Sequence, residues 1–128
     1  RNLLEKKPIE VYGNGQQLRD FNYIDDCVNA FLIAGIKEKA NGKIYNLGSN
    51  EVSSLENIAK KMSKFVPDSS FNIVPFPNER KAIDIGDYYG DYSLISSELH
   101  WNPLISLDEG LKKTIEYYKL HSLHYRDV

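Results

Sequence analysis

Residues 12–26 read YGNGQQLRDFNYIDD, and this stretch organises the rest of the chain. The residues before it, Ile9 to Tyr12, form a short β-prone run, and Gly13-Asn14-Gly15 is a strong turn signal. The pattern therefore predicts a strand that leads into a tight loop. Arg19 follows this loop and precedes a helical pattern, so a fixed cation stands where three elements meet.

Helical patterns are predicted on both sides of this stretch. The first seven residues are typical of the tail of a helix that Pro8 stops. A second short strand is predicted at Phe21 to Tyr23, and Asp25 is predicted to cap a helix that ends near Asn41-Gly42. Apolar residues at helical spacing support this helix: Val28, Phe31, Leu32, Gly35 and Ile36.

The middle of the chain alternates between strand and helix signals. Lys43 to Leu47 predicts a strand. Ser53 to Glu56 has the pattern of a capping box and opens a helix that Pro67 stops. Its apolar stripe consists of Leu55, Ile58, Ala59, Met62 and Phe65. Phe71 to Phe76 predicts an edge strand because prolines bound it.

The last third begins with an irregular polar segment, Asn78 to Gly90, of a length that is more often functional than incidental. Asp91 predicts the cap of a short helix through Leu99, and Ser106 to Glu109 is a second capping box that opens a terminal helix. Short strands interspersed with helices predict an α/β fold of α+β character. We expect one domain over residues 1–128, with a small mixed sheet and packed helices.

The composition fits an ordinary globular domain and narrows the partners. The chain has 128 residues, 41% hydrophobic and 27% charged, and its formal net charge of −2 gives no basic surface for nucleic acid. No apolar run approaches the roughly 20 residues that a membrane span needs, so we expect no membrane partner. Cys27 is the single cysteine and cannot form an internal disulfide, which predicts a reducing, cytoplasmic location.

The sequence contains no catalytic motif that we can identify. No tyrosine has a lysine four residues later, and no Gly-x-Ser-x-Gly elbow surrounds a serine. The glycine pair Gly13 and Gly15 has Leu18 where the third glycine of a dinucleotide-binding loop would stand, which favours a hairpin-like turn. We predict no metal site either, because His100, His121 and His124 lack further ligands at matching positions.

Binding chemistry is better represented than catalytic chemistry. After the glycine turn, the guanidinium of Arg19 and nearby backbone N–H groups can converge on a phosphate oxygen. The alternative is an ion pair between Arg19 and Asp20 or Asp25. Later in the chain Arg80 and Lys81 form a second pair of cations close to Asp84, whose carboxylate can accept hydrogen bonds from hydroxyl groups. Two cations and one acidic acceptor suit a nucleoside diphosphate. The alternative is that this segment is a solvated charged loop.

Four ordered motifs, covering nearly the whole chain, resemble a known family. They lie at residues 11–26, 44–56, 79–91 and 99–111. Together they resemble the C-terminal, substrate-binding part of extended short-chain dehydrogenases/reductases, the NAD-dependent nucleotide-sugar epimerases and dehydratases that are similar to UDP-glucose 4-epimerase. The motif at residues 11–26 resembles the "RDF-x-YV-x-D" segment of that family, and the motif at residues 44–56 is similar to its "YN-x-GS" strand.

The resemblance implies roles for individual residues. Arg19 would bind the diphosphate, and Tyr12 would lie against the nucleobase while the backbone of residues 9–11 reads the edge of the base. Asn46 would lie near the phosphates, and Asp84 would bond the ribose hydroxyls.

A second phosphate-binding cation is implied, but its position is ambiguous. Its usual place, three residues before the ribose-binding acid, holds Lys81, and Arg80 stands one residue earlier. Both are therefore kept in the predicted substrate-binding set, which is Tyr12, Arg19, Asn46, Arg80, Lys81 and Asp84. His100 departs from the family, which usually has a glycine there to accept a left-handed conformation.

The resemblance also implies a missing half. The catalytic Tyr-x-x-x-Lys and the NAD-binding Rossmann domain of the family belong to an N-terminal half that this chain does not contain, and a start at Arg1 agrees with that view. We expect the substrate-binding portion of a homodimeric enzyme acting on UDP- or dTDP-sugars, without turnover when isolated. Two alternatives stay open: a non-catalytic interaction domain that retains the fold, and a reductase or decarboxylase branch of the family.

Overall fold

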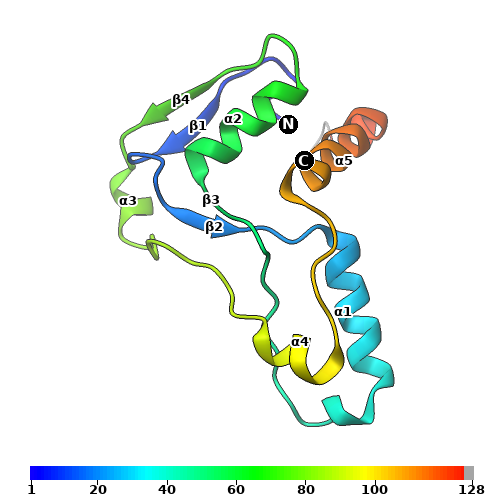
Figure 1. Ribbon diagram of the computed structural model, residues 1–128. Helices are drawn as coiled ribbons and strands as arrows, with labels where there is room; N and C mark the ends of the chain where they lie inside the picture. The colour runs from blue at the N-terminus through cyan, green and yellow to red at the C-terminus, as the bar shows by residue number, and fades with distance from the viewer. Residues whose placement is uncertain (126–128) are drawn as a thin grey trace.

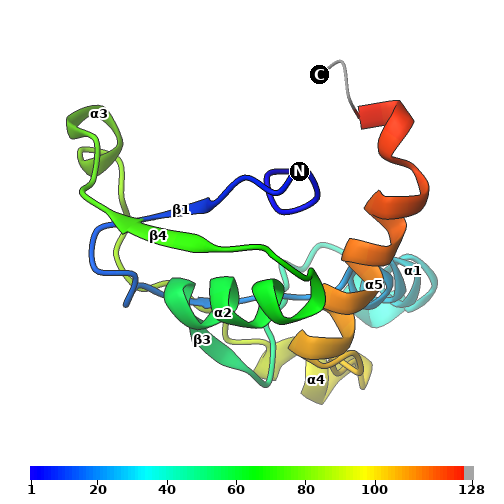
Figure 2. The ribbon, with the colours of Figure 1, turned by 90° about the horizontal axis from the view of Figure 1, so that it is seen from above.

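The computed structural model describes residues 1–125 and has helices arranged around two separate pairs of short strands (Figures 1 and 2). In chain order the elements are β1 (Ile9–Tyr12), β2 (Leu18–Asp20), α1 (Ile24–Ile36), η1 (Glu38–Ala40), β3 (Val52–Ser54), α2 (Leu55–Phe65), β4 (Phe71–Val74), α3 (Asn78–Lys81), α4 (Ser93–Leu99), α5 (Leu107–Leu120) and η2 (Ser122–Tyr125). The predicted fold class, a small mixed α/β domain, is confirmed.

The first strand pair joins β1 to β4 in parallel, with Ile9 opposite Phe71 and Tyr12 opposite Val74. Helix α2 directly precedes β4 in the chain and lies against one face of this strand pair (Figure 2). The strand predicted at Ile9 to Tyr12 is confirmed. The predicted edge strand is confirmed over Phe71–Val74 and ends where Pro75 removes a backbone donor.

The second pair joins β2 to β3 in antiparallel fashion, with Leu18 opposite Ser54 and Asp20 opposite Val52. The strand predicted at residues 21–23 is therefore wrong, because the strand lies three residues earlier. The partner strand supplies hydrogen bonds only as far as Asp20, and Tyr23 instead precedes the next helix. This shift places Arg19 at the centre of a paired strand.

Helix α1 begins at Ile24 after an extended Tyr23, so the predicted cap at Asp25 is wrong. Asp25 lies in the first helical turn, where a carboxylate still interacts favourably with the helix dipole. The helix ends at Ile36, and the short 3₁₀ helix η1 continues to Ala40, close to the predicted end.

The apolar stripe of α1 does not face the described core. Phe31 is 75% exposed and Ile36 is 80% exposed, whereas Ala30 is buried on the opposite face. Ala30 packs with Ile95 and Trp101. Helical spacing thus identified the helix, and the stripe is left uncovered by residues 1–125.

The strand predicted at Lys43 to Leu47 is wrong. This segment has no strand partner within the described residues, and side chains hold it instead (Figure 1). Lys43 Nζ and Tyr45 Oη donate to the carboxylate of Glu98 at 2.6 and 2.7 Å. Strand propensity alone does not create a strand where no second backbone supplies the ladder.

Serine caps begin the two longer helices of the second half. Ser54 Oγ accepts from Asn57 N at the start of α2, so the predicted capping box at Ser53 is displaced by one residue. Ser106 Oγ accepts from Glu109 N at the start of α5, as predicted. The cap predicted at Asp91 for α4 is displaced by one residue, because the N-cap is Tyr92, although Asp91 Oδ1 still accepts from Ser93 N at 2.8 Å.

The N-terminal residues form hydrogen-bonded turns, so the helix predicted over the first seven residues is wrong. Glu5 N donates to Arg1 O, but Lys6 has a φ of 57°, which ends the helical path before Pro8. Leu3 is buried and packs with Val66 and Ile115 in a core cluster separate from that of Ala30 and Trp101. Within residues 1–125, every helix is too short or too polar to cross a membrane.

Candidate functional site

Arg19 lies at the centre of β2 with its side chain only 21% exposed. Its Nη1 donates to Leu18 O at 2.7 Å and to Gly86 O, and its Nη2 lies 3.8 Å from Asp84 Oδ1. The guanidinium is thus held by two backbone carbonyls beside a carboxylate from a distant segment. The alternative partners Asp20 and Asp25 are not its ion-pair partners.

A cavity of about 380 Å³ lies beside β1. Its lining comes from β1, α2 and the segment after β4, and comprises Ile9, Glu10, Val11, Tyr12, Leu55, Ile58, Ala59, Met62, Phe76, Arg80, Ile83 and Asp84. The guanidinium of Arg80 lies 5.5 Å from the centre of the Tyr12 ring. The centres of the Tyr12 and Phe76 rings lie 5.9 Å apart. The cavity therefore combines an aromatic wall, a cation and a carboxylate.

The structure brings four of the six predicted residues together. Tyr12, Arg80 and Asp84 line the cavity, and Arg19 adjoins it through Asp84. Of the two candidates for the second cation, Arg80 lines the cavity and its neighbour in α3 does not.

The other two predicted residues lie outside this group. Asn46 and Lys81 are exposed, and neither lines the cavity. Asn46 belongs to the extended segment between η1 and β3, and Lys81 is the last residue of α3.

Sequence reasoning missed several residues of this site. Phe76 completes the aromatic wall, and its position between two prolines was the signal available for an ordered side chain. Ile83 also lines the cavity. Asp87 accepts from Leu18 N at 2.8 Å and ties the polar segment to β2, a long-range contact with no local sequence signal.

The glycine turn after β1 does not fit a dinucleotide cofactor. Gly13 and Gly15 have φ values of 77° and 71°, as a tight turn requires. A Cβ on Gly15 would meet Glu56 Cβ at 3.0 Å, and Glu56 N donates to Gly15 O at 2.9 Å. Helix α2 therefore closes the turn and fills the space that a pyrophosphate would need. The predicted hairpin-like turn is wrong, because β1 and β2 on either side of the turn pair with β4 and β3 and not with each other.

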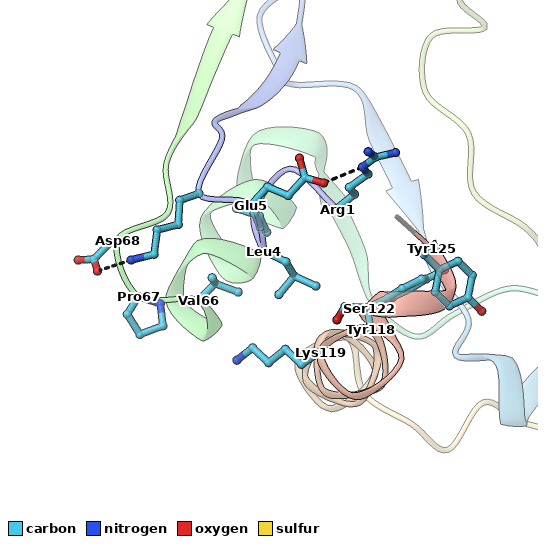
Figure 3. A pocket seen from close by; sticks show the side chains of 12 residues that line it. Arg1, Leu4, Glu5, Val66, Pro67, Asp68, Tyr118, Lys119, Ser122 and Tyr125 are labelled. Atoms are coloured by element: carbon cyan, nitrogen blue, oxygen red, sulfur yellow. Dashed lines mark hydrogen bonds and ion pairs between the residues drawn. The ribbon is translucent and has the colours of Figure 1, made fainter. Parts of the chain in front are cut away.

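A larger cavity of about 780 Å³ lies at another part of the molecule, between the N-terminal turns, the end of α2 and the end of α5 (Figure 3). Its wall carries Lys6, Lys119 and Tyr118, and Glu5 forms ion pairs there. Hydrogen bonds from Lys7 and Arg1 lower the pKa of Glu5 to about 2. None of the predicted site residues lines this cavity.

The histidines do not gather with other metal ligands in the described residues. The rings of His121 and His124 lie 6.2 Å apart, and no group of three or more histidine, cysteine or acidic side chains is close enough to hold an ion within residues 1–125.

Comparisons with known proteins place these features in a family. Residues 1–114 match the family model described as GDP-mannose 4,6 dehydratase. The chain is 32% identical over 131 residues to dTDP-glucose 4,6-dehydratase of Haemophilus influenzae, covering 94% of this chain and 38% of that protein. This chain thus spans a little over one third of the length of that relative.

Two solved structures share the fold over nearly all of this chain. UDP-glucose 4-epimerase of Thermotoga maritima, solved with UDP-glucose, has a TM-score of 0.83 and 27% identity, covering 94% of this chain and 38% of that chain. UDP-glucuronic acid 4-epimerase of Bacillus cereus, solved with NAD, has a TM-score of 0.77 and 30% identity, covering 94% and 37%. The chain therefore belongs to the GDP-mannose 4,6 dehydratase family, among the extended short-chain dehydrogenases/reductases that include nucleotide-sugar epimerases and dehydratases.

Proposed function

We propose that this chain is the nucleotide-binding portion of an NAD-dependent nucleotide-sugar epimerase or dehydratase, and that its ligand is a UDP- or dTDP-sugar. One observation carries the proposal. The guanidinium of Arg19 is held by two backbone carbonyls beside Asp84, and Asp84 itself lines a cavity with an aromatic wall. A fixed cation beside such a cavity suits a diphosphate attached to a base.

The base would lie along β1. Tyr12 and Phe76 supply apolar ring surface, and the backbone of Ile9 to Val11 lines the same cavity. In the described residues β1 pairs with β4 on one side only, so peptide groups on its other side lack a strand partner. Such N–H and C=O groups can hydrogen-bond the edge of a base.

The diphosphate would lie between two arginines. Nη2 of Arg19 lies 3.8 Å from Asp84, beyond direct hydrogen-bond range, so it can donate to a phosphate oxygen without breaking a bond to protein. Arg80, which lines the cavity, would supply the second cation, and Asp84 would accept from the ribose hydroxyls. Asn46 and Lys81 stay in the proposed set as exposed contacts to the phosphates.

An N-terminal half would supply the rest of the enzyme. We assign NAD and the catalytic Tyr-x-x-x-Lys to it, because the glycine turn of this chain is closed by α2. The exposed stripe of α1, which includes Phe31 and Ile36, supports a covering domain of this kind. Binding of the nucleotide by this chain would hold the sugar over the nicotinamide, which would accept a hydride and return it. We further propose that the whole enzyme is a homodimer and acts in the cytoplasm, a reducing compartment in which a free cysteine such as Cys27 stays a thiol.

Calorimetric titration with UDP tests the role of Arg19. We expect the wild-type chain to bind UDP and Arg19→Ala to raise Kd by at least about tenfold, because a charge-assisted contact is lost. Lys119→Ala is the matched control, since it removes a cation from the larger cavity and should leave Kd unchanged. No heat from the wild type, or equal heat from Arg19→Ala, would contradict the proposal.

Absence of Arg19-dependent UDP binding would favour the second candidate, a non-catalytic interaction domain, which the exposed α1 stripe would also suit.

A turnover assay tests whether the catalytic residues lie outside this chain. The isolated chain with added NAD⁺ should neither epimerise UDP-glucose nor dehydrate dTDP-glucose, since this chain's residues do not fit NAD. Product formed by the chain alone would show that a catalytic centre lies within it.

A further inference from the structure

The segment from Asp84 to Gly90, here named the strap, lies along β2. Leu18 N donates to Asp87 Oδ1 at 2.8 Å, and Tyr88 N donates back to Leu18 O at 3.0 Å. Tyr88 also forms an isolated parallel bridge with the next residue of β2. The strap thus runs beside β2 in a defined register, although it is not itself a strand.

Asp20 fixes the other end of the strap. Its Oδ2 accepts from Gly90 N and from Ser49 N, both at 3.1 Å. Gly90 crosses Gly48 at this point, and a Cβ on either glycine would overlap the backbone of the other segment. One carboxylate therefore ties β2, the strap and the segment before β3 together.

We propose that Asp20 and Asp87 are positioning residues for diphosphate binding, an inference that rests on the proposed role of Arg19. Neither carboxylate lines the cavity, and Asp20 lies on the face of β2 opposite its neighbour Arg19. Both act through the strap, because the strap supplies the Gly86 carbonyl and the Asp84 carboxylate beside the guanidinium. If the strap slipped along β2, these partners would leave the guanidinium without a fixed orientation.

The register of the strap affects the affinity for a diphosphate because it preorganises the side chain of Arg19. An arginine side chain has several rotatable bonds, and binding a phosphate with a free one costs conformational entropy. A strap in register removes that cost before the ligand arrives. The register depends on hydrogen bonds that backbone N–H groups donate to the side-chain oxygens of Asp20 and Asp87.

Titration with UDP tests the inference. Asp20→Ala and Asp87→Ala should each raise Kd by about tenfold while the binding stoichiometry stays that of the wild type. Asp20→Asn and Asp87→Asn should stay close to wild type, because the amide oxygen still accepts from the same N–H groups. Asp91→Ala is the matched control, since the hydrogen bond that Asp91 accepts comes from Ser93 N at the start of α4 rather than from β2 or the strap.

Two further readouts separate positioning from a general structural role. A structural defect alone would lower the stoichiometry with an unchanged Kd for the folded fraction. In the Arg19→Ala background, Asp87→Ala should have no further effect on Kd, because the group that it positions is gone. Wild-type binding that depends on Arg19, combined with unchanged Kd in both alanine variants, would overturn this inference and leave the proposed function standing. Failure of the wild type to bind UDP would overturn both.

Discussion

At the scale of single residues, Glu98 gathers two donors from the extended segment that precedes β3. Lys43 and Tyr45 both donate to its carboxylate, and these hydrogen bonds hold the pKa of Glu98 below its ordinary value. Burial, together with the bond to Glu98, raises the pKa of Tyr45 to about 12. The cluster replaces the strand pairing that this segment lacks.

Tyr45 gives a pH dependence with a definite sign. Its phenol ionises at an ordinary pKa of 10.0 when unfolded and at about 12 when folded, so the folded state holds more protons between these values. The free energy of unfolding should therefore fall as the pH rises from 10 to 12. Tyr45→Phe should make this fall shallower in urea unfolding at each pH. An equally steep fall in the variant would contradict the assignment.

The sequence placed four residues of the proposed site in recognisable motifs. In the structure Tyr12, Arg80 and Asp84 line one cavity and Arg19 adjoins it, while their role in binding stays a prediction. The strap contacts were not foreseen, because a backbone N–H in β2 that binds Asp87 leaves no trace in local sequence. Long-range hydrogen bonds of this kind depend on the path of the chain.

At the scale of elements, helix α4 ends at a residue whose backbone conformation is strained. His100 has φ 59° and ψ 32°, the left-handed conformation, and its N–H donates to Ser96 O at 3.0 Å. The turn that a glycine would make is therefore kept by a residue with a Cβ. For such residues this conformation is strained.

His100→Gly should raise the free energy of unfolding by about 1 kcal/mol, because relief of strain outweighs the added freedom of the unfolded chain. Urea unfolding measures the change. His100→Ala is the control and should stay within about 0.5 kcal/mol of wild type, since alanine carries the same Cβ. If glycine and alanine gave equal stabilities, strain at this position would be refuted.

Elements were predicted well where the signal is local. Prolines ended α2 and β4 near the expected residues, and Ser106 caps α5 as predicted. Strand predictions failed at residues 21–23 and 43–47, because a strand needs a partner that sequence alone does not specify. The apolar periodicity predicted helix α1 correctly, but it does not indicate which domain or subunit would cover the apolar stripe.

At the scale of the whole molecule, helix α1 has an apolar stripe that residues 1–125 leave open. Phe31 and Ile36 are 75% and 80% exposed, and Ile24, Leu32 and Val28 continue the stripe. In Figure 1 α1 lies at one side of the molecule, away from β1 and β4. The proposed N-terminal half would bury this surface.

Without a covering domain the stripe should promote self-association of the chain. The double substitution Phe31→Gln and Ile36→Gln should shift sedimentation velocity profiles towards monomer, while the free energy of unfolding stays within about 0.5 kcal/mol because both side chains are already in water. Leu120→Gln is the control, because Leu120 is 82% exposed at the end of α5, away from the stripe. Equal association of both variants would count against the stripe as the contact.

The central claim is that the nucleotide binds beside Arg19 rather than in the larger cavity. Amide chemical-shift mapping during a UDP titration tests it most directly. We predict saturable shifts at Tyr12, Arg19 and Asp84, at or beside the smaller cavity. Shifts confined to Lys6 and Tyr118 in the larger cavity, or no saturable shift at any amide, would contradict it.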